Sequence, residues 1–206
     1  MEDRLRLQWH QVRDRLVAKR LLLPPEASLS LRIPGRDEMW FGGAGEDVPR
    51  RLAWNGRAGC VHGAVYAARG DVGALAVGGG AWGLLLADFG GRMPEVFDEQ
   101  ARHLGRMGPP AADAQELPAA LAAGGNVQLV QGNPVCLGTT ATRLALNAEL
   151  FEKCAKAYVL AAASGGRVRP LPWLVRHVAN GRLLKDERQA RERFVQGLLP
   201  VESKGY

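Results

Sequence analysis

Few side chains in this sequence could do chemistry, and two of them are separated by a single residue. Cys60 and His62 offer a thiolate and an imidazole, which are common zinc ligands, and Cys136 could supply a third donor. Residues 59–69 are expected to form a short helix, on which positions two apart point about 200° away from each other. We therefore expect Cys60 and His62 not to share one ion, and His62 to be a packed, hydrogen-bonded residue. The other three histidines stand alone in the sequence and are expected at the surface: His10, His103 and His177.

A glycine-rich segment suggests a second kind of chemistry, the binding of phosphate by backbone amides. Residues 78–83 follow an apolar stretch and satisfy the fingerprint G-x-G-x-x-G of dinucleotide-binding proteins, with Asp98 about 20 residues further on. Two residues disfavour this interpretation. Pro94 lies within what would be the second strand, and Trp82 would put a large side chain beside the pyrophosphate. Dinucleotide binding through Gly78–Gly83 is kept as an alternative.

The elements that must position these residues are helices and strands of one domain, residues 1–206. Leu5, Trp9, Val12 and Leu16 recur at helical spacing, and the continuous apolar run at 72–77 is typical of a central strand. The expected helices are 3–20, 59–69, 82–89, 95–105, 116–123, 142–164 and about 184–195. The expected strands are 28–33 and 38–41, which form a hairpin, then 72–77, 126–131 and 135–137, with 42–57 as a loop.

Four segments resemble the class II aldolase/adducin superfamily, and together they cover most of the chain. They are ASLSLRIPG from Ala27, VHGAVYAARGDV from Val61, NVQLVQGNPVCLG from Asn126 and LNAELFEKCAKAYVLA from Leu146. The resemblance implies a three-layer α/β/α fold around a central mixed, mostly antiparallel sheet, assembled as a homo-tetramer with clefts at the subunit contacts. It also implies a zinc ion held by three histidines, which stabilises an enediolate as a Lewis acid, and an acidic residue that moves the proton.

The residues that the resemblance places at these functional positions cannot perform that chemistry. The first two ligand positions fall on Val77 and Gly79, the third falls on Asn133, and the acid/base position falls on or near Ala58. Valine, glycine and alanine side chains offer neither a lone pair nor a proton, and an asparagine carbonyl alone does not hold zinc. We therefore predict no catalytic residue and no metal ligand of the family's kind, and no cofactor.

The space left by the missing imidazoles has two possible fates. It could be filled by Trp40, Phe41 or Trp82, since an empty cavity of that size would cost several kcal/mol. Alternatively the cleft persists and binds a small phosphorylated or sugar-like ligand. The residues expected to line such a residual cleft are Cys60, His62, Trp82, Cys136 and Tyr206.

Composition limits the partners and the location. The net charge is +6, and residues 165–206 hold nine Lys/Arg against four acids. The acids are interleaved with the arginines, as on a solvated helix face, so nucleic acid is not expected as a partner. No run of 18 apolar residues is present, and the charged start Met1–Arg4 is unlike a secretory signal. Three cysteines, an odd number, suit reduced thiols, and we expect a cytoplasmic protein without membrane contact.

These observations leave three functional hypotheses. The first is a non-catalytic or functionally diverged protein of this fold, which binds a small ligand or serves in assembly. The second is a metal-independent enzyme acting on a sugar phosphate or a related carbonyl compound in the same cleft, through residues such as His62, Cys60, Cys136, Asn133 and Tyr206. The third is the dinucleotide-binding protein described above.

Overall fold

One six-stranded sheet organises the chain in the computed structural model, which describes residues 2–55, 60–122 and 125–202. The strand order is β3-β2-β1-β4-β6-β5, and every neighbouring pair is antiparallel. An isolated parallel bridge, Ala111 to Val130, adds to the β5 edge. The strands are β1 Leu23–Arg32, β2 Glu38–Gly43, β3 Arg50–Ala53, β4 Ala74–Gly79, β5 Val127–Val130 and β6 Asn133–Gly138.

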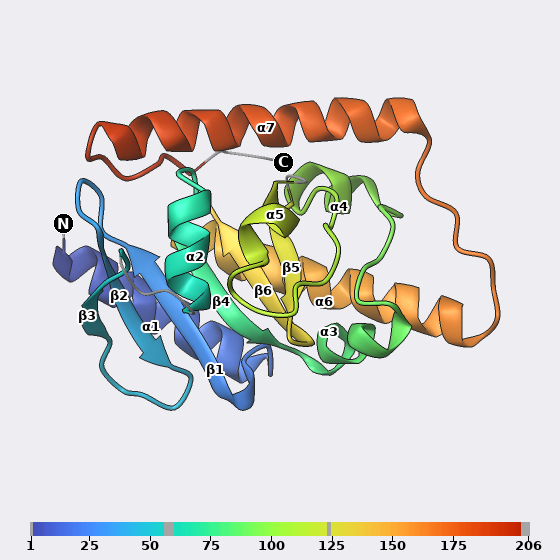
Figure 1. The fold of residues 1–206 in the computed structure, drawn as a ribbon, viewed down its shortest axis with the longest axis horizontal. Helices are drawn as coiled ribbons and strands as arrows, with labels where there is room; N and C mark the ends of the chain where they lie inside the picture. The colour runs from blue at the N-terminus through green and yellow to red at the C-terminus, as the bar shows by residue number, and fades with distance from the viewer. Residues whose placement is uncertain (1, 56–59, 123–124, 203–206) are drawn as a thin grey trace.

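Helices cover both faces of this sheet and give the three layers that were expected (Figure 1). The α2 and α5 helices lie on one face, and α1 and α6 lie on the other, while α7 runs along the edge of the layers. Each face has its own buried apolar cluster. The helices are α1 Glu2–Ala18, α2 Val61–Ala68, α3 Ala81–Leu85, η1 Leu86–Phe89, α4 Asp98–His103, α5 Leu117–Leu121, α6 Ala141–Ala163 and α7 Trp173–Val195.

The strongest sequence patterns are confirmed. Leu5, Trp9, Val12 and Leu16 are all buried on one side of α1. The predicted hairpin forms between β1 and β2, with Ser30 opposite Phe41. The apolar run at 72–77 contributes to β4, which has β1 on one side and β6 on the other.

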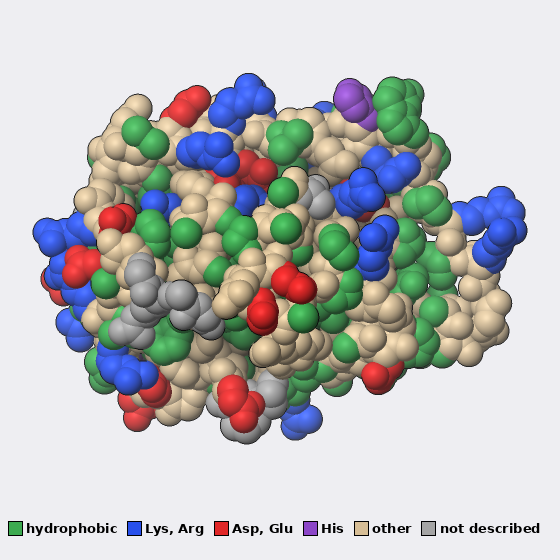
Figure 2. Space-filling model, in the orientation of Figure 1, with side chains coloured by type: hydrophobic (Ala, Val, Ile, Leu, Met, Phe, Trp, Pro, Cys, Tyr) green, Lys and Arg blue, Asp and Glu red, His purple; other side chains and the backbone are tan. Residues whose placement is uncertain are grey.

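Three predicted boundaries are wrong. The strand expected over 28–33 begins five residues earlier, at Leu23. The segment 42–57 was expected to be a loop, but it contains the edge strand β3. Arg50 and Arg51 are both exposed, so this strand lacks the alternation of apolar and polar residues that would have predicted it. The last helix begins at Trp173 and not near 184. Its first half lacks a buried stripe, since Trp173 is 68% exposed and Leu174 is 63% exposed, and hydrophobic side chains lie at the surface over this end of the helix (Figure 2). Burial periodicity therefore gives no signal there. No helix within the described ranges is long and apolar enough to cross a membrane.

Candidate functional site

The three expected ligand positions lie at the end of β4 and the start of β6, two strands that pair with each other. Val77 pairs with Val135 across the two strands. Beyond Val77 the alternation of side chains is interrupted, because Gly78 has a positive φ of 108°. Gly79 faces Pro134, whose strand partner Leu129 belongs to the cluster on the α1 and α6 side. Val77 packs against the apolar cluster on the α2 and α5 side, to which Val135 belongs. The fourth position, Ala58, lies outside the described residues.

Pro134 occupies the space beside Gly79. A Cβ added at this buried glycine would lie 2.7 Å from Pro134 Cγ and 3.1 Å from its Cβ. The ring of Pro134 therefore lies directly beside this glycine. Asn133 is also engaged, because its Nδ2 donates to the Gln131 carbonyl over 3.3 Å. The residues present here do not fit the zinc site that the fold family implies. Within the chain described by the structure, no three His, Cys, Asp or Glu side chains are grouped to hold a metal ion.

This contact predicts the effect of a single methyl group. We expect Gly79→Ala to lower the free energy of unfolding by about 1–3 kcal/mol, because the new Cβ overlaps the Pro134 ring. In a Pro134→Gly background the same change should cost much less, since the partner of the overlap is gone. Urea denaturation of the four proteins measures the coupling. Gly45→Ala is the control, because a Cβ there meets nothing within 4 Å. An equal loss for Gly79→Ala in both backgrounds would contradict the prediction.

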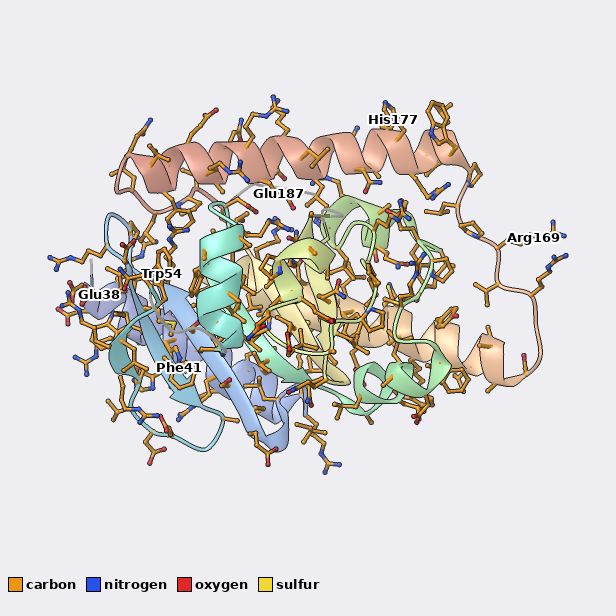
Figure 3. The ribbon with its side chains drawn as sticks, viewed as in Figure 1. Glu38, Phe41, Trp54, Arg169, His177 and Glu187 are labelled. Carbon is orange, nitrogen blue, oxygen red and sulfur yellow. The ribbon has the colours of Figure 1, made fainter. Side chains whose placement is uncertain are left out.

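Next to these positions, four polar side chains form a buried network between α2 and β1. His62 Nε2 lies 2.9 Å from Ser28 Oγ, and His62 Nδ1 lies 2.7 Å from Ser30 Oγ, which also contacts the Tyr66 hydroxyl at 2.9 Å. The Phe41 ring meets the imidazole edge-to-face at 4.9 Å, and Figure 3 shows Phe41 projecting from β2 on this side. Burial lowers the pKa of His62 to about 3 and raises the pKa of Tyr66 above its ordinary value.

The network engages both ring nitrogens of His62. With this pKa the imidazole is neutral at neutral pH, so one ring nitrogen donates a hydrogen bond and the other accepts one. Both nitrogens are already used by serines, and the residue is only 3% exposed. No lone pair is left for a metal or a substrate. His62 joins α2 to β1, which is the packed and hydrogen-bonded role that the sequence suggested.

The two cysteines named as cleft candidates do not meet. Cys60 immediately precedes α2 and is partly exposed. Cys136 pairs with Ala76 and belongs to the cluster on the α1 and α6 face, and its burial raises the pKa of the thiol to about 12. The sheet therefore separates Cys136 from Cys60 and His62. Tyr206, the remaining candidate, lies outside the residues that the structure describes.

The glycine-rich turn is occupied by a side chain of the protein itself. Glu152 of α6 accepts hydrogen bonds from the backbone amides of Trp82, at 2.8 Å, and Gly83, at 2.9 Å. A Cβ at Gly80 would lie 2.4 Å from the same carboxylate, so the glycine permits this approach. Trp82 is half-buried and packs on the α1 and α6 side of the sheet, with Lys156 Nζ 5.7 Å from its ring centroid.

These facts argue against dinucleotide binding at residues 78–83. A dinucleotide fingerprint needs a strand in a parallel sheet and free amides at the start of the next helix. Here β4 is antiparallel to both its neighbours, and Glu152 satisfies two of the amides that a pyrophosphate would use. Through these two hydrogen bonds Glu152 joins α3 to α6.

A buried ionic cluster that was not predicted from the sequence joins α7 to the rest of the molecule. Arg69 binds both carboxylate oxygens of Asp71, at 2.9 and 2.7 Å, and lies 3.0 Å from Glu187 of α7. It also donates to the Gly125 carbonyl and to Asn126 Oδ1. Figure 3 shows Glu187 pointing from α7 toward the body of the protein. Burial, together with repulsion from the Asp71 carboxylate, raises the pKa of Glu187 to about 7, although Arg69 acts to lower it. The Arg-x-Asp turn was visible in the sequence, but its partner 116 residues later was not.

A second histidine departs from expectation. His103 was expected at the surface, but it is only 8% exposed, and Arg143 lies within 3.1 Å of its Nδ1. Burial and the neighbouring arginines lower the pKa of His103 to about 4. His103 ends α4, which packs against both α6 and α7, so its place is set by tertiary contacts and not by a local pattern.

Solved structures share this architecture. YgbL from Klebsiella pneumoniae matches with a TM-score of 0.71 and 19% identity, over 87% of this chain and 99% of that one. The L-fuculose-1-phosphate aldolase from Thermus thermophilus matches with a TM-score of 0.65 and 17% identity, over 82% of this chain and 100% of that one. An aldolase II superfamily protein from Pseudomonas syringae gives 0.64 and 15%, over 96% and 95% of the two chains.

At the level of sequence alone, no protein-family model matches the chain, and no curated protein is significantly similar to it. The fold itself defines an α/β protein with an antiparallel sheet between two helical layers. More specifically, its structural neighbours are class II aldolase superfamily proteins, and it has their fold.

Proposed function

We propose that this chain is a class II aldolase-like protein without zinc-dependent aldolase chemistry, which acts by binding a small ligand or by assembly. The observation that carries the proposal is the packing of Pro134 against Gly79, at a position where the resemblance calls for a metal-binding histidine. A Lewis acid needs donor side chains on rigid elements with room for an open coordination position. Zinc-binding donors are missing at Val77, Gly79 and Asn133, and at Gly79 the Pro134 ring takes the room that a side chain would need.

The side chains that could support metal-independent chemistry near these positions already have partners within the protein or lie on the other face of the sheet. Both nitrogens of His62 bind serines, Cys136 lies on the opposite face, and Glu152 closes the glycine turn. This supports the non-catalytic proposal over a metal-independent enzyme.

Assembly is part of the proposal. The resemblance implies a homo-tetramer, and we propose that the chain forms a homo-oligomer in the cytoplasm, without nucleic acid or membrane partners. Light scattering coupled to size exclusion measures the mass directly. A particle of four chains is the expected result, and a monomer at micromolar concentration would refute this part of the proposal.

The zinc content of the purified protein tests whether zinc-dependent chemistry has been lost. We expect purified protein, incubated with zinc and then desalted, to retain less than about 0.1 zinc per chain, because an all-protein site needs three or four donors that these positions lack. We also expect no cleavage of L-fuculose 1-phosphate. The aldolase from Thermus thermophilus, treated identically, is the positive control. Stoichiometric zinc together with turnover would overturn the proposal.

A further inference from the structure

A separate cleft lies beyond the region of Gly79, between the segment 89–95, residues 106–107, α6 and the linker that leads into α7. Its volume is about 520 Å³, which is within the range of about 300–1,000 Å³ for small-molecule sites. Its walls combine apolar side chains with three arginines and a single carboxylate. The side chains that the argument uses are Arg92, Met93, Glu95, Arg106, Met107 and Arg176.

The cleft contains a buried acceptor and a buried donor that the protein does not satisfy. Glu95 is only 4% exposed, and its Oε2 lies 3.7 Å from Arg176 Nη1, which is too long for a hydrogen bond. Its Oε1 and the Arg176 Nε are both buried without a hydrogen-bond partner in the described chain. Buried polar atoms are nearly always paired in native proteins, so these two atoms indicate a bound group that offers both an acceptor and a donor.

Two further arginines bring positive charge to the same cleft. Arg92 and Arg106 are exposed and form no ion pair or hydrogen bond with any residue that the structure describes. With Arg176 they give three guanidinium groups against one carboxylate, an excess that favours a multiply charged anion.

The backbone around the cleft is fixed by hydrogen bonds of its own. The Leu171 amide donates to the Glu95 carbonyl over 2.8 Å, which holds the linker against the segment 89–95. Gln100, buried on α4, accepts from the Val96 amide and donates to the Pro94 carbonyl, each over 3.0 Å. A ligand entering here would therefore order little new structure, which lowers the cost of binding.

We propose that this cleft binds a small phosphomonoester that also carries a hydroxyl group. The phosphate oxygens accept from the guanidinium groups of Arg92, Arg106 and Arg176. The hydroxyl donates to Glu95 Oε1, and the carbon skeleton lies against Met93 and Met107. This site is independent of the proposed loss of zinc chemistry, because it shares no residue with the end of β4.

Glycerol 3-phosphate is the probe, and isothermal titration of the full chain measures its Kd. We expect it to bind at least about tenfold more tightly than methyl phosphate, inorganic phosphate or glycerol, because only the probe engages both the arginines and Glu95. Arg92→Met combined with Arg106→Met should weaken it by about tenfold or more. The matched control is Arg167→Met with Arg169→Met, which removes the same charge from the exposed linker, where Arg169 points into solvent (Figure 3). That control should change the Kd by less than about twofold.

Each outcome decides the proposal. Glu95→Gln should reduce the advantage of glycerol 3-phosphate over methyl phosphate while leaving methyl phosphate binding nearly unchanged. Absence of saturable binding would overturn the site, and so would binding that survives the Arg92/Arg106 change. Equal affinity for glycerol 3-phosphate and inorganic phosphate would mean that the cleft binds anions without specificity, and it would refute the hydroxyl contact with Glu95. None of these results bears on zinc content or on aldolase activity.

Discussion

Replacing Arg69 with methionine is expected to lower the free energy of unfolding by about 3–5 kcal/mol, because the change leaves two carboxylates buried without their counter-charge. Arg69 is 7% exposed, Asp71 is 1% exposed, and water cannot replace the lost guanidinium. The substitution also removes the donors to Gly125 and Asn126, so the start of β5 loses its link to the turn before β4. Urea denaturation followed by circular dichroism measures the loss.

The same cluster contains a control for this prediction. Arg191 also approaches Asp71, at 3.7 Å, but its side chain is 60% exposed. Arg191→Met should therefore cost less than about 1 kcal/mol. Adding Asp71→Asn and Glu187→Gln to Arg69→Met should recover part of the loss, since no buried charge then remains. If Arg69→Met and Arg191→Met are equally mild, the buried cluster is not a determinant of stability.

Acid is expected to destabilise the protein through His62. The folded-state pKa of about 3 lies below the ordinary value of 6.5, so the unfolded chain binds the extra proton first as the pH falls. The stability from this group is complete above about pH 6.5 and is lost toward pH 3, by up to about 1.4 kcal/mol per pH unit. Between pH 7 and pH 4 the loss should reach about 2–3 kcal/mol.

The contribution of His62 can be isolated by comparison. His62→Gln should give a shallower fall of unfolding free energy over the same pH range, whereas His177→Gln, at an exposed position, should follow the wild type. His103 acts in the same direction, and Glu187 acts in the opposite one, since its raised pKa weakens the fold as the pH rises toward 7. Only the difference between wild type and His62→Gln therefore tests the argument. Parallel pH profiles for these two proteins would refute it.

The parts of the fold that could be predicted are those whose burial repeats along the chain. The stripe of α1 and the apolar run of β4 are local signals, and each corresponds to an element. The edge strand β3 and the first half of α7 are mostly solvated, so burial leaves no period in their sequences. In α7 the buried residues begin at Leu183 and continue to Phe194, and the predicted helix covers this part of α7, from about 184.

The candidate site was harder to predict because its contacts join distant parts of the chain. Pro134 meets Gly79 across two paired strands, and Glu152 reaches the amide of Trp82 from a helix that begins 59 residues later. The sequence shows which side chains are missing from a position, but only the strand register shows which neighbour has taken their place. The packing of His62 was predictable, whereas its two serine partners follow from the pairing of β1 with β4.

The contact between Pro134 and Gly79 also constrains how such a protein could change over evolution. A histidine introduced at position 79 would collide with the proline ring before it could serve any ion, and removing the ring first would open a void between the strands. A change at either of these two positions therefore carries a cost in stability of its own. Sequences that descend from this one can therefore change at other surfaces at a lower cost in stability than at the contact between Pro134 and Gly79.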